Sequence, residues 1–265
     1  NENEADVETR QRFWACIGGM GLTGIILEAT FSIIPITNKL ISVDTEKYRD
    51  LDSLMEAMIQ ADKQYQYSVA WIDSGSKEGK GILTCGNHAS FNQLTEDQKS
   101  TALKYDPKDS LSAPKFLPNG LLNQWTIRAF NETWFRKSPE KEVGDLQEIG
   151  KYFHPLDGIQ NWNRIYGSKG FIQYQFVVPD THAYLIKNTL EDLRGIGAIS
   201  FLTVLKRFGK GNNSYLSFPK EGWTLAVDLP ANIKELNLTL NYIDQKVVEA
   251  GGRIYLAKDS RQSPT

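Results

Sequence analysis

Short runs in which apolar and polar side chains alternate, the period of a β-strand, recur along the chain. They predict strands at residues 40–43, 67–73, 81–85, 170–178, 199–208, 223–229 and 253–257. Apolar residues at helical spacing predict helices at residues 45–63, 180–194 and 231–250. The second half therefore follows the order β-α-β-β-α-β. We predict an α+β fold, a large antiparallel sheet with helices packed on one face and ferredoxin-like βαββαβ elements.

Periodicity is poor between residues 90 and 151, where four prolines interrupt a set of aromatic side chains. The aromatic residues are Phe116, Trp125, Phe130, Trp134 and Phe135. One interpretation is an irregular, mobile cover over a functional site, because long irregular segments in compact domains are often functional. The alternative is that these side chains simply pack helices and a small subcore.

Four glycines fall within residues 18–24, between two apolar runs. The run from Gly19 to Gly24 has the spacing of the dinucleotide-binding fingerprint. That fingerprint needs a helix after the glycines, whereas residues 25–33 alternate as a strand does and Pro35 ends the run. We therefore predict a glycine turn between strands rather than a phosphate loop of the Rossmann type.

Composition excludes several function classes. The chain has 265 residues, of which 40% are hydrophobic and 23% charged, and its formal net charge of −2 disfavours nucleic-acid binding. No apolar run approaches the roughly 20 residues that span a bilayer, and no signal peptide is evident. The two cysteines and three histidines show no metal-binding spacing, so no metal is expected. Neither a Walker loop nor a GxSxG elbow is present.

Alternation also sorts the polar strand residues onto faces. Gln173 and Gln175 share one face of their strand, and Lys206 and Thr224 are the polar candidates on two later strands. Two amides two residues apart make a hydrogen-bonding surface that suits the hydroxyls of a sugar. A solvated outer face of the sheet is the alternative.

Several runs closely resemble one family. They include Gly170-Phe-Ile-Gln-Tyr-Gln-Phe176, residues 152–157, 161–167, 216–219 and 67–73, the glycine turn, and the run 251–261 that contains Ala-Lys-Asp-Ser-Arg. These runs are similar to the decaprenylphosphoryl-β-D-ribose 2-oxidase family, the flavin subunit of the epimerase that makes the arabinose donor of mycobacterial cell walls. That family belongs to the FAD-linked oxidases of the vanillyl-alcohol oxidase/p-cresol methylhydroxylase superfamily.

The resemblance implies roles for individual residues. Lys258 would lie near the flavin and be needed to oxidise the 2-hydroxyl of the sugar, where an ammonium can stabilise developing negative charge. The residues implied on the cofactor are Gly19, Gly21, Gly24, Ile25 and Tyr255. The residues implied in the substrate pocket are Trp71, Gln173, Gln175, Lys206, Thr224 and Ala226.

Two positions depart from simple expectation. Thr224 and Ala226 stand where mycobacterial members carry an asparagine and a cysteine, so the substrate of this protein can differ from theirs.

Strict alternation would place Tyr255 and Lys258 on opposite faces of the last strand. We therefore expect the last strand to end or bend near Ala257 if both side chains meet the flavin.

The resemblance implies an FAD-dependent oxidoreductase that moves hydride from a secondary hydroxyl of a sugar to the flavin. A polyprenyl-phosphate pentose is the substrate it suggests, with a short-chain reductase as partner and a location in the cytoplasm or at the membrane periphery. A sugar-lactone or alditol oxidase, and a non-catalytic ligand-binding module, remain as alternatives.

The same resemblance predicts the domain organisation. Residues 1–37 would be the end of an FAD-binding domain, with a remnant of its fold, residues 38–250 the substrate-binding domain, and residues 251–265 the return into the FAD-binding domain. The chain looks like a fragment without the N-terminal FAD-binding half and the C-terminal segment. We do not expect such a fragment to retain FAD or activity by itself.

Overall fold

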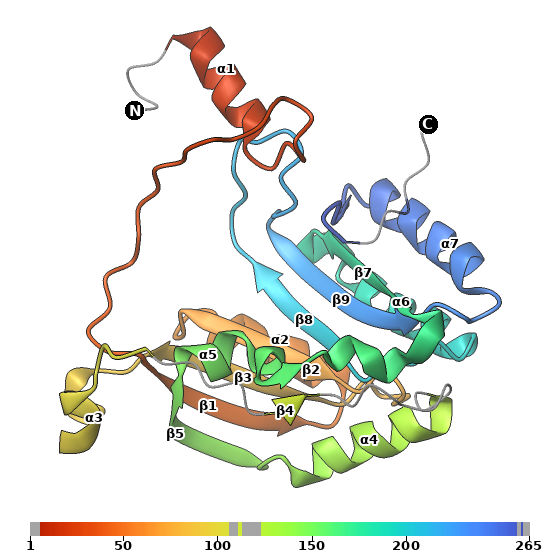
Figure 1. Ribbon diagram of the computed structural model, residues 1–265. Helices are drawn as coiled ribbons and strands as arrows, with labels where there is room; N and C mark the ends of the chain where they lie inside the picture. Colours follow the sequence, from red (N-terminus) through yellow and green to blue (C-terminus); the bar gives the residue numbers. More distant parts are fainter. Residues whose placement is uncertain (1–5, 106–110, 113–122, 259–260, 262–265) are drawn as a thin grey trace.

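An eight-stranded antiparallel sheet forms the centre of the protein (Figure 1). The computed structural model describes residues 6–105, 111–112, 123–258 and 261. The strand order is β10-β7-β9-β8-β2-β3-β1-β5, so neighbours in the sheet are mostly not neighbours in the sequence. The strands are β1 (Leu40–Tyr48), β2 (Tyr67–Ile72), β3 (Gly81–His88), β5 (Lys141–Glu148), β7 (Phe171–Val178), β8 (Thr203–Phe208), β9 (Gly222–Pro230) and β10 (Arg253–Ile254). Two short strands, β4 (Leu111–Ser112) and β6 (Ile159–Gln160), pair in parallel apart from this sheet.

Three helices cover one face of the large sheet, here called the helix face. They are α2 (Leu51–Ala61), α6 (Tyr184–Gly195) and α7 (Leu236–Glu249). Their buried side chains, among them Leu54, Leu193 and Leu240, form one core with Phe176 and Leu225 of the strands. Each fully buried side chain of this size contributes about 1.5–3 kcal/mol. The prediction of an α+β fold with a large antiparallel sheet is confirmed, whereas the expectation that helices pack on only one face is wrong, because α4 (Gln124–Lys137) and α5 (Ile149–Phe153) cover part of the other.

The boundary between β1 and α2 differs from the prediction. We expected a helix over residues 45–63, but residues up to Tyr48 continue β1 and pair with β3. The helix begins only after Asp50, whose side chain accepts a hydrogen bond from the backbone N–H of Ser53. An N-cap of this kind satisfies a free N–H of the first turn, which fixes where the helix starts.

The opposite face of the sheet, here called the open face, is covered on one half by two helices that the sequence did not predict. Helices α4 (Gln124–Lys137) and α5 (Ile149–Phe153) pack there. The buried stripe of α4 is Ile127, Asn131 and Phe135, so a polar residue interrupts its apolar periodicity. Because β5 is a polar edge strand, it too lacks a clear pattern. The prediction that residues 90–151 are irregular is therefore wrong for α4 and β5, and Phe116 lies outside the described residues.

The remaining described helices are short or peripheral. Helix α1 (Val7–Cys16) precedes the glycine turn, and α3 (Glu96–Ser100) follows β3. Single turns of 3-10 helix are η1 (Phe91–Gln93), η2 (Pro155–Gly158) and η4 (Asp180–His182), while η3 (Trp162–Lys169) spans two such turns across a kink. Of the helices in the described ranges, none has the length and apolar character to cross a bilayer.

The glycine turn follows a helix, so the prediction of a turn between two strands is wrong. Gly18 and Gly19 end α1, and a Cβ on Gly19 would lie 2.3 Å from the carbonyl oxygen of Ala15. After the turn, residues 25–36 run as an extended segment that forms no strand ladder with the described residues. Leu27 and Phe31 of this segment are 93% and 77% exposed. Figure 1 shows it leading from α1 to the start of β1.

Replacing Asn131 tests what holds α4 on the open face. Its side-chain NH2 donates to Asp73 (2.9 Å) and to the carbonyl of Ser200 (3.0 Å), and the residue is fully buried. Asn131→Leu leaves both acceptors without this donor, so we expect a loss of about 1–3 kcal/mol in the free energy of unfolding. Denaturant unfolding measures it. Arg136→Ala, on the exposed side of α4, should change stability by less than about 0.5 kcal/mol; equal losses would contradict this role of Asn131.

Candidate functional site

The predicted polar residues lie side by side on the open face. Antiparallel pairing sets Gln175 opposite Ala226 and Lys206 opposite Thr224, so β7, β9 and β8 present these side chains in one layer. On the next strand, Trp71 pairs with Val204 and faces the same way. The sequence therefore predicted correctly that Gln173, Gln175, Lys206 and Thr224 share a face.

Hydrogen bonds between neighbouring strands fix the two amides. Gln175 donates to the hydroxyl of Thr224 (3.1 Å), and Gln173 donates to the carboxylate of Asp228 (3.2 Å). Thr224 and Asp228 are 1% and 5% exposed, so they form the floor beneath the amides. The side-chain carbonyl of Gln175 keeps no partner among the described residues and can accept a hydrogen bond from a ligand hydroxyl.

Lys206 lies at the edge of this layer, within electrostatic range of Lys258. Lys206 is exposed on the open face, yet desolvation by the surrounding protein lowers its pKa, and the positive charge of Lys258 lowers it further. Within the described residues, neither lysine forms an ion pair with a carboxylate. Two unpaired cations side by side favour an anionic ligand, since a negative charge between them would relieve their repulsion.

Tyr255 and Lys258 lie on the same side, although strict alternation along a strand would separate them. Strand β10 ends at Ile254 rather than near Ala257, and the N–H of Lys258 donates back to the carbonyl of Tyr255 (3.2 Å). This turn places the Lys258 ammonium 5.9 Å above the centre of the Tyr255 ring. Tyr255 in turn stacks on Phe218 at 4.4 Å and bonds through its N–H to Gln175.

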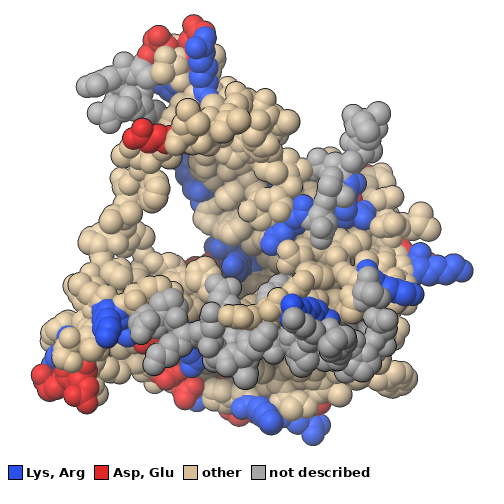
Figure 2. All heavy atoms as spheres, viewed as in Figure 1, with Lys and Arg blue, Asp and Glu red and all other residues tan. Residues whose placement is uncertain are grey.

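The start of the glycine turn contacts the loop that carries Phe218, the residue on which Tyr255 stacks. Ser214 donates to the carbonyl of Ile17, and the backbone of Ser217, next to Phe218, lies against Gly18. Gly19 is buried in the end of α1, whereas Gly21 and Gly24 have positive φ and open space around them. Ile25 is 88% exposed. In Figure 2, Lys and Arg side chains gather at the hollow between this segment and the sheet.

These features fit one side of a flavin site. An exposed glycine turn lets a backbone approach a large cofactor closely, and unpaired cations suit its phosphates or a reduced, anionic ring. Gly21 and Gly24 have open space around them, Ile25 is exposed, and Lys258 lies over the ring of Tyr255, while Gly19 packs against the last turn of α1. Among the described residues, no group of three His, Cys, Asp or Glu side chains could hold a metal.

Sequence reasoning missed three residues of the site. Asp228 holds Gln173, Phe218 supports Tyr255, and Tyr166 stacks on Phe171 at 4.1 Å near the end of β7. Burial and then the Asp228 carboxylate raise the pKa of Tyr166. Asp228 alternates with Thr224 and Ala226 in the sequence, but its pairing with Gln173 depends on the sheet register. No periodic signal marks Phe218 or Tyr166.

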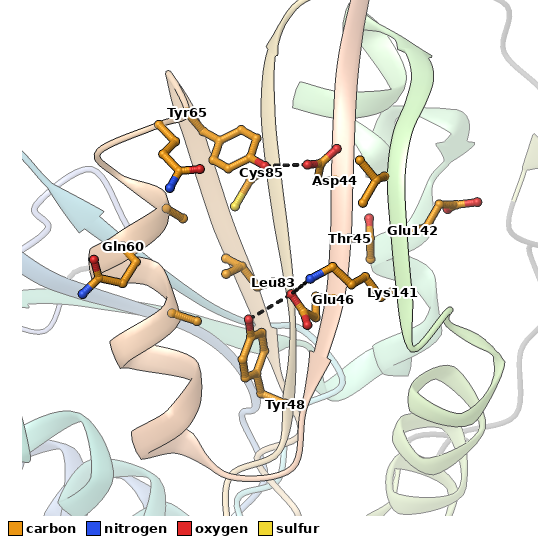
Figure 3. Close-up of a pocket in the computed structure, with 14 residues that line it drawn as sticks. Asp44, Thr45, Glu46, Tyr48, Gln60, Tyr65, Leu83, Cys85, Lys141 and Glu142 are labelled. Carbon is orange, nitrogen blue, oxygen red and sulfur yellow. Dashed lines mark hydrogen bonds and ion pairs between the residues drawn. The ribbon is translucent and has the colours of Figure 1, made fainter.

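A second hollow, of about 250 Å³, lies on the helix face between α2 and the strands β1, β3 and β5 (Figure 3). Its polar groups satisfy one another: Tyr65 donates to Asp44, while Tyr48 and Lys141 both donate to Glu46. The hydrogen bond to Asp44 raises the pKa of Tyr65 to about 12. None of the residues predicted for the site lines this hollow, so it is separate from the layer around Gln175.

Comparison with known proteins identifies several relatives, among them the following two. The chain is 40% identical over 253 residues to decaprenylphosphoryl-beta-D-ribose oxidase of Mycolicibacterium smegmatis, covering 94% of this chain and 55% of that protein. It is 31% identical over 264 residues to an uncharacterized protein in the mprA 5' region of Streptomyces coelicolor, covering 95% of this chain and 71% of that protein. The chain thus spans about half the length of the mycobacterial relative. No family model matches it.

Solved structures with a related arrangement include 6-hydroxy-D-nicotine oxidase from Arthrobacter nicotinovorans, with a TM-score of 0.45 and 10% identity over 93% of this chain and 51% of that one. A variant of berberine bridge enzyme, described as a reticuline dehydrogenase, gives a TM-score of 0.42 and 13% identity over 90% of this chain and 46% of that one. Both similarities are too low to indicate a shared activity.

The paired cations give a direct pH test. Lys258→Ala removes one positive charge beside Lys206, so we expect the pKa of Lys206 to rise toward its ordinary value, with only the effect of burial left. Carbon-13 NMR of reductively methylated lysines measures this titration. Lys246→Ala, on the exposed side of α7, is the control. An unchanged Lys206 titration in Lys258→Ala would show that the two ammonium groups do not interact.

Proposed function

The chain belongs to the decaprenylphosphoryl-β-D-ribose oxidase family, and from that premise we propose that it carries the substrate-binding part of an FAD-dependent oxidoreductase. The reaction is oxidation of a secondary alcohol of a sugar to a ketone, in which hydride would pass from the carbon that carries the hydroxyl to bound FAD and the hydroxyl proton would leave to solvent. One observation supports this proposal above the others: Lys206 is paired across strands with Thr224, whose hydroxyl holds the amide of Gln175, and Lys258 lies over the ring of Tyr255, whose N–H bonds to the carbonyl of Gln175.

The proposed substrate is a lipid-linked sugar phosphate, of which the name of the mycobacterial relative gives one example. The carbonyl of Gln175 offers an acceptor for a sugar hydroxyl, and the two ammonium groups suit a phosphate. Ala226 and Thr224 complete this wall and set its size and polarity.

A series of aromatic side chains beside the polar layer supports the proposal that the substrate carries a lipid. The indole N–H of Trp71 bonds to the carbonyl of Phe201, and the Phe201 ring packs edge-on against Phe130 of α4. Phe130 stacks with Trp134, and both are about half exposed. Aromatic faces that lead from a polar site to the surface fit an isoprenoid chain, which needs apolar cover but no hydrogen bonds.

The proposed chemistry assigns each side chain a task. Bound FAD would supply the hydride acceptor. The Lys258 ammonium would hold the oxygen of the reacting hydroxyl and stabilise negative charge, since a fixed cation acts most strongly in a site of low polarity. Lys206 would hold the substrate anion, and Gln175 would orient the sugar so that one hydroxyl faces Lys258.

We also propose that residues 1–37 and 251–265 belong to the FAD-binding domain and residues 38–250 to the substrate-binding domain. The exposed apolar side chains of the extended segment support this boundary, because an alternating strand with such exposure needs a sheet to pair with. The contact between Gly18 and Ser217 supports a junction of the two domains near the flavin.

Kinetics of the flavin-loaded enzyme with a lipid-linked ribose phosphate test the assigned tasks. Lys258→Ala should lower kcat about 100-fold or more, because it removes charge stabilisation at the reacting oxygen. Lys206→Met should mainly raise KM, about 10-fold, because it removes binding of the anion. The matched control Lys187→Met, exposed on α6 at the helix face and outside this layer, should leave both constants unchanged. Turnover of Lys258→Ala at the unsubstituted rate would refute the proposal.

Flavin content tests the domain boundary. Leu27→Glu places a charge on the exposed apolar segment, so we expect it to reduce several-fold the FAD that the full-length protein retains on purification, while the unfolding transition of the substrate-binding domain is unchanged. Glu28→Gln, the neighbouring residue on the opposite side of the segment, is the control. Absorbance near 450 nm, per protein, measures the content; full retention by Leu27→Glu would argue against a sheet partner there.

A further inference from the structure

The described residues Tyr255 and Arg261 lie on opposite faces of the sheet. At the start of the segment that joins them, the N–H of Tyr255 bonds to the carbonyl of Gln175, and the Tyr255 ring stacks on Phe218 on the open face. At its end, Arg261 lies on the helix face against α7 and over the ring of Tyr174. Lys258, proposed as the catalytic lysine, lies between these two attachment points in the sequence.

Arg261 makes three contacts with one face of α7. Its guanidinium donates to Asn241 (2.8 Å), Asn237 (3.3 Å) and Asp244 (3.3 Å), residues spaced by four and three along the helix. Such spacing places all three acceptors on one side of α7. We call Arg261, Asn237, Asn241 and Asp244 the Arg261 clamp.

The clamp is buried and connected to the core. The Arg261 side chain is 8% exposed, and its charged group lies 5.9 Å from the centre of the Tyr174 ring. The hydroxyl of Tyr174 donates to the second oxygen of Asp244 (2.7 Å), so one carboxylate joins the segment to β7 and α7. A planar guanidinium that bonds several oxygens at once fixes direction as well as position.

Stability alone does not account well for this arrangement. Taking a guanidinium and a carboxylate out of water costs free energy that their attraction roughly offsets, so a buried ion pair is weak evidence for a stabilising role. The only described side chain of catalytic interest on the segment between the clamp and Tyr255 is Lys258. Its distance from Lys206 and from the Tyr255 ring depends on where this segment is held.

We propose that Arg261 is a positioning residue, which holds the segment against α7 and thereby places the Lys258 ammonium on the open face beside Lys206. The placement is a property of this chain, whereas its catalytic consequence rests on the proposed function. Arg261 acts from the opposite face of the sheet and has no contact with Lys206.

Arg261→Gln in the flavin-loaded enzyme tests the proposal with two readouts. We expect kcat to fall about 10- to 100-fold with KM changed by no more than about twofold, because a displaced lysine loses contact with the reacting oxygen but not the substrate anion at Lys206. The second readout, the Lys206 titration by NMR of methylated lysines, needs no turnover; the pKa of Lys206 should rise as Lys258 moves away.

Two further variants separate positioning from stability. Asp244→Asn removes the anionic partner and should shift kcat and the Lys206 titration in the same direction as Arg261→Gln. Lys246→Gln removes a cation from the exposed side of the same helix, where it pairs with Glu249, and should change neither. In a Lys258→Ala background, Arg261→Gln should leave the Lys206 titration unchanged, since the charge to be displaced is already absent.

The outcomes distinguish this inference from the proposed function. A lowered unfolding temperature of Arg261→Gln with an unchanged Lys206 titration would overturn the positioning role and leave a structural one. Full turnover by Lys258→Ala together with a shifted Lys206 titration in Arg261→Gln would refute the proposed function and support the placement. A shift of the titration in both the single variant and the Lys258→Ala background would also overturn the inference, because the effect would then not pass through Lys258.

Discussion

The antiparallel pairing of β9 with β7 on one side and β8 on the other is the constraint on which the site depends. This register sets Gln173 against Asp228, Gln175 beside Thr224, and Lys206 opposite Thr224. Because side chains alternate between faces, a slip by one residue would send the whole set into the helix-face core. The buried residues of the other face, such as Phe176, Leu225 and Leu205, prevent that slip, so the core determines the site.

The alternation of apolar and polar residues predicts which side chains share a face of a strand, but it does not predict the order of the strands in the sheet. It placed Gln173, Gln175, Lys206 and Thr224 together, since each face assignment depends only on local alternation. The pairing of Asp228 with Gln173 could not be predicted from the sequence, because β9 lies between β7 and β8 in the sheet but after both in the sequence. The resemblance to a family, rather than any pattern, singled out Lys258 and Tyr255.

Local patterns failed where tertiary contacts decide the structure. Asn131 occupies a core position of α4 because Asp73 and Ser200 need its amide, and this polar residue hid the helix. Residues 25–36 alternate like a strand and are extended, yet no described strand pairs with them. Alternation specifies an extended backbone with two distinct faces, but it does not specify a partner. Gly19 was assigned to a cofactor although its immediate role is to end α1.

The two lysines connect the fold to the proposed chemistry. Their repulsion is unfavourable in the folded protein, and a site that tolerates it gains affinity for an anion. The most direct test of the account is the absorbance of the flavin-loaded protein during anaerobic addition of a lipid-linked ribose phosphate. We expect bleaching near 450 nm with the unsubstituted protein and none with Lys258→Ala. Equal bleaching in both, or in neither, would contradict it.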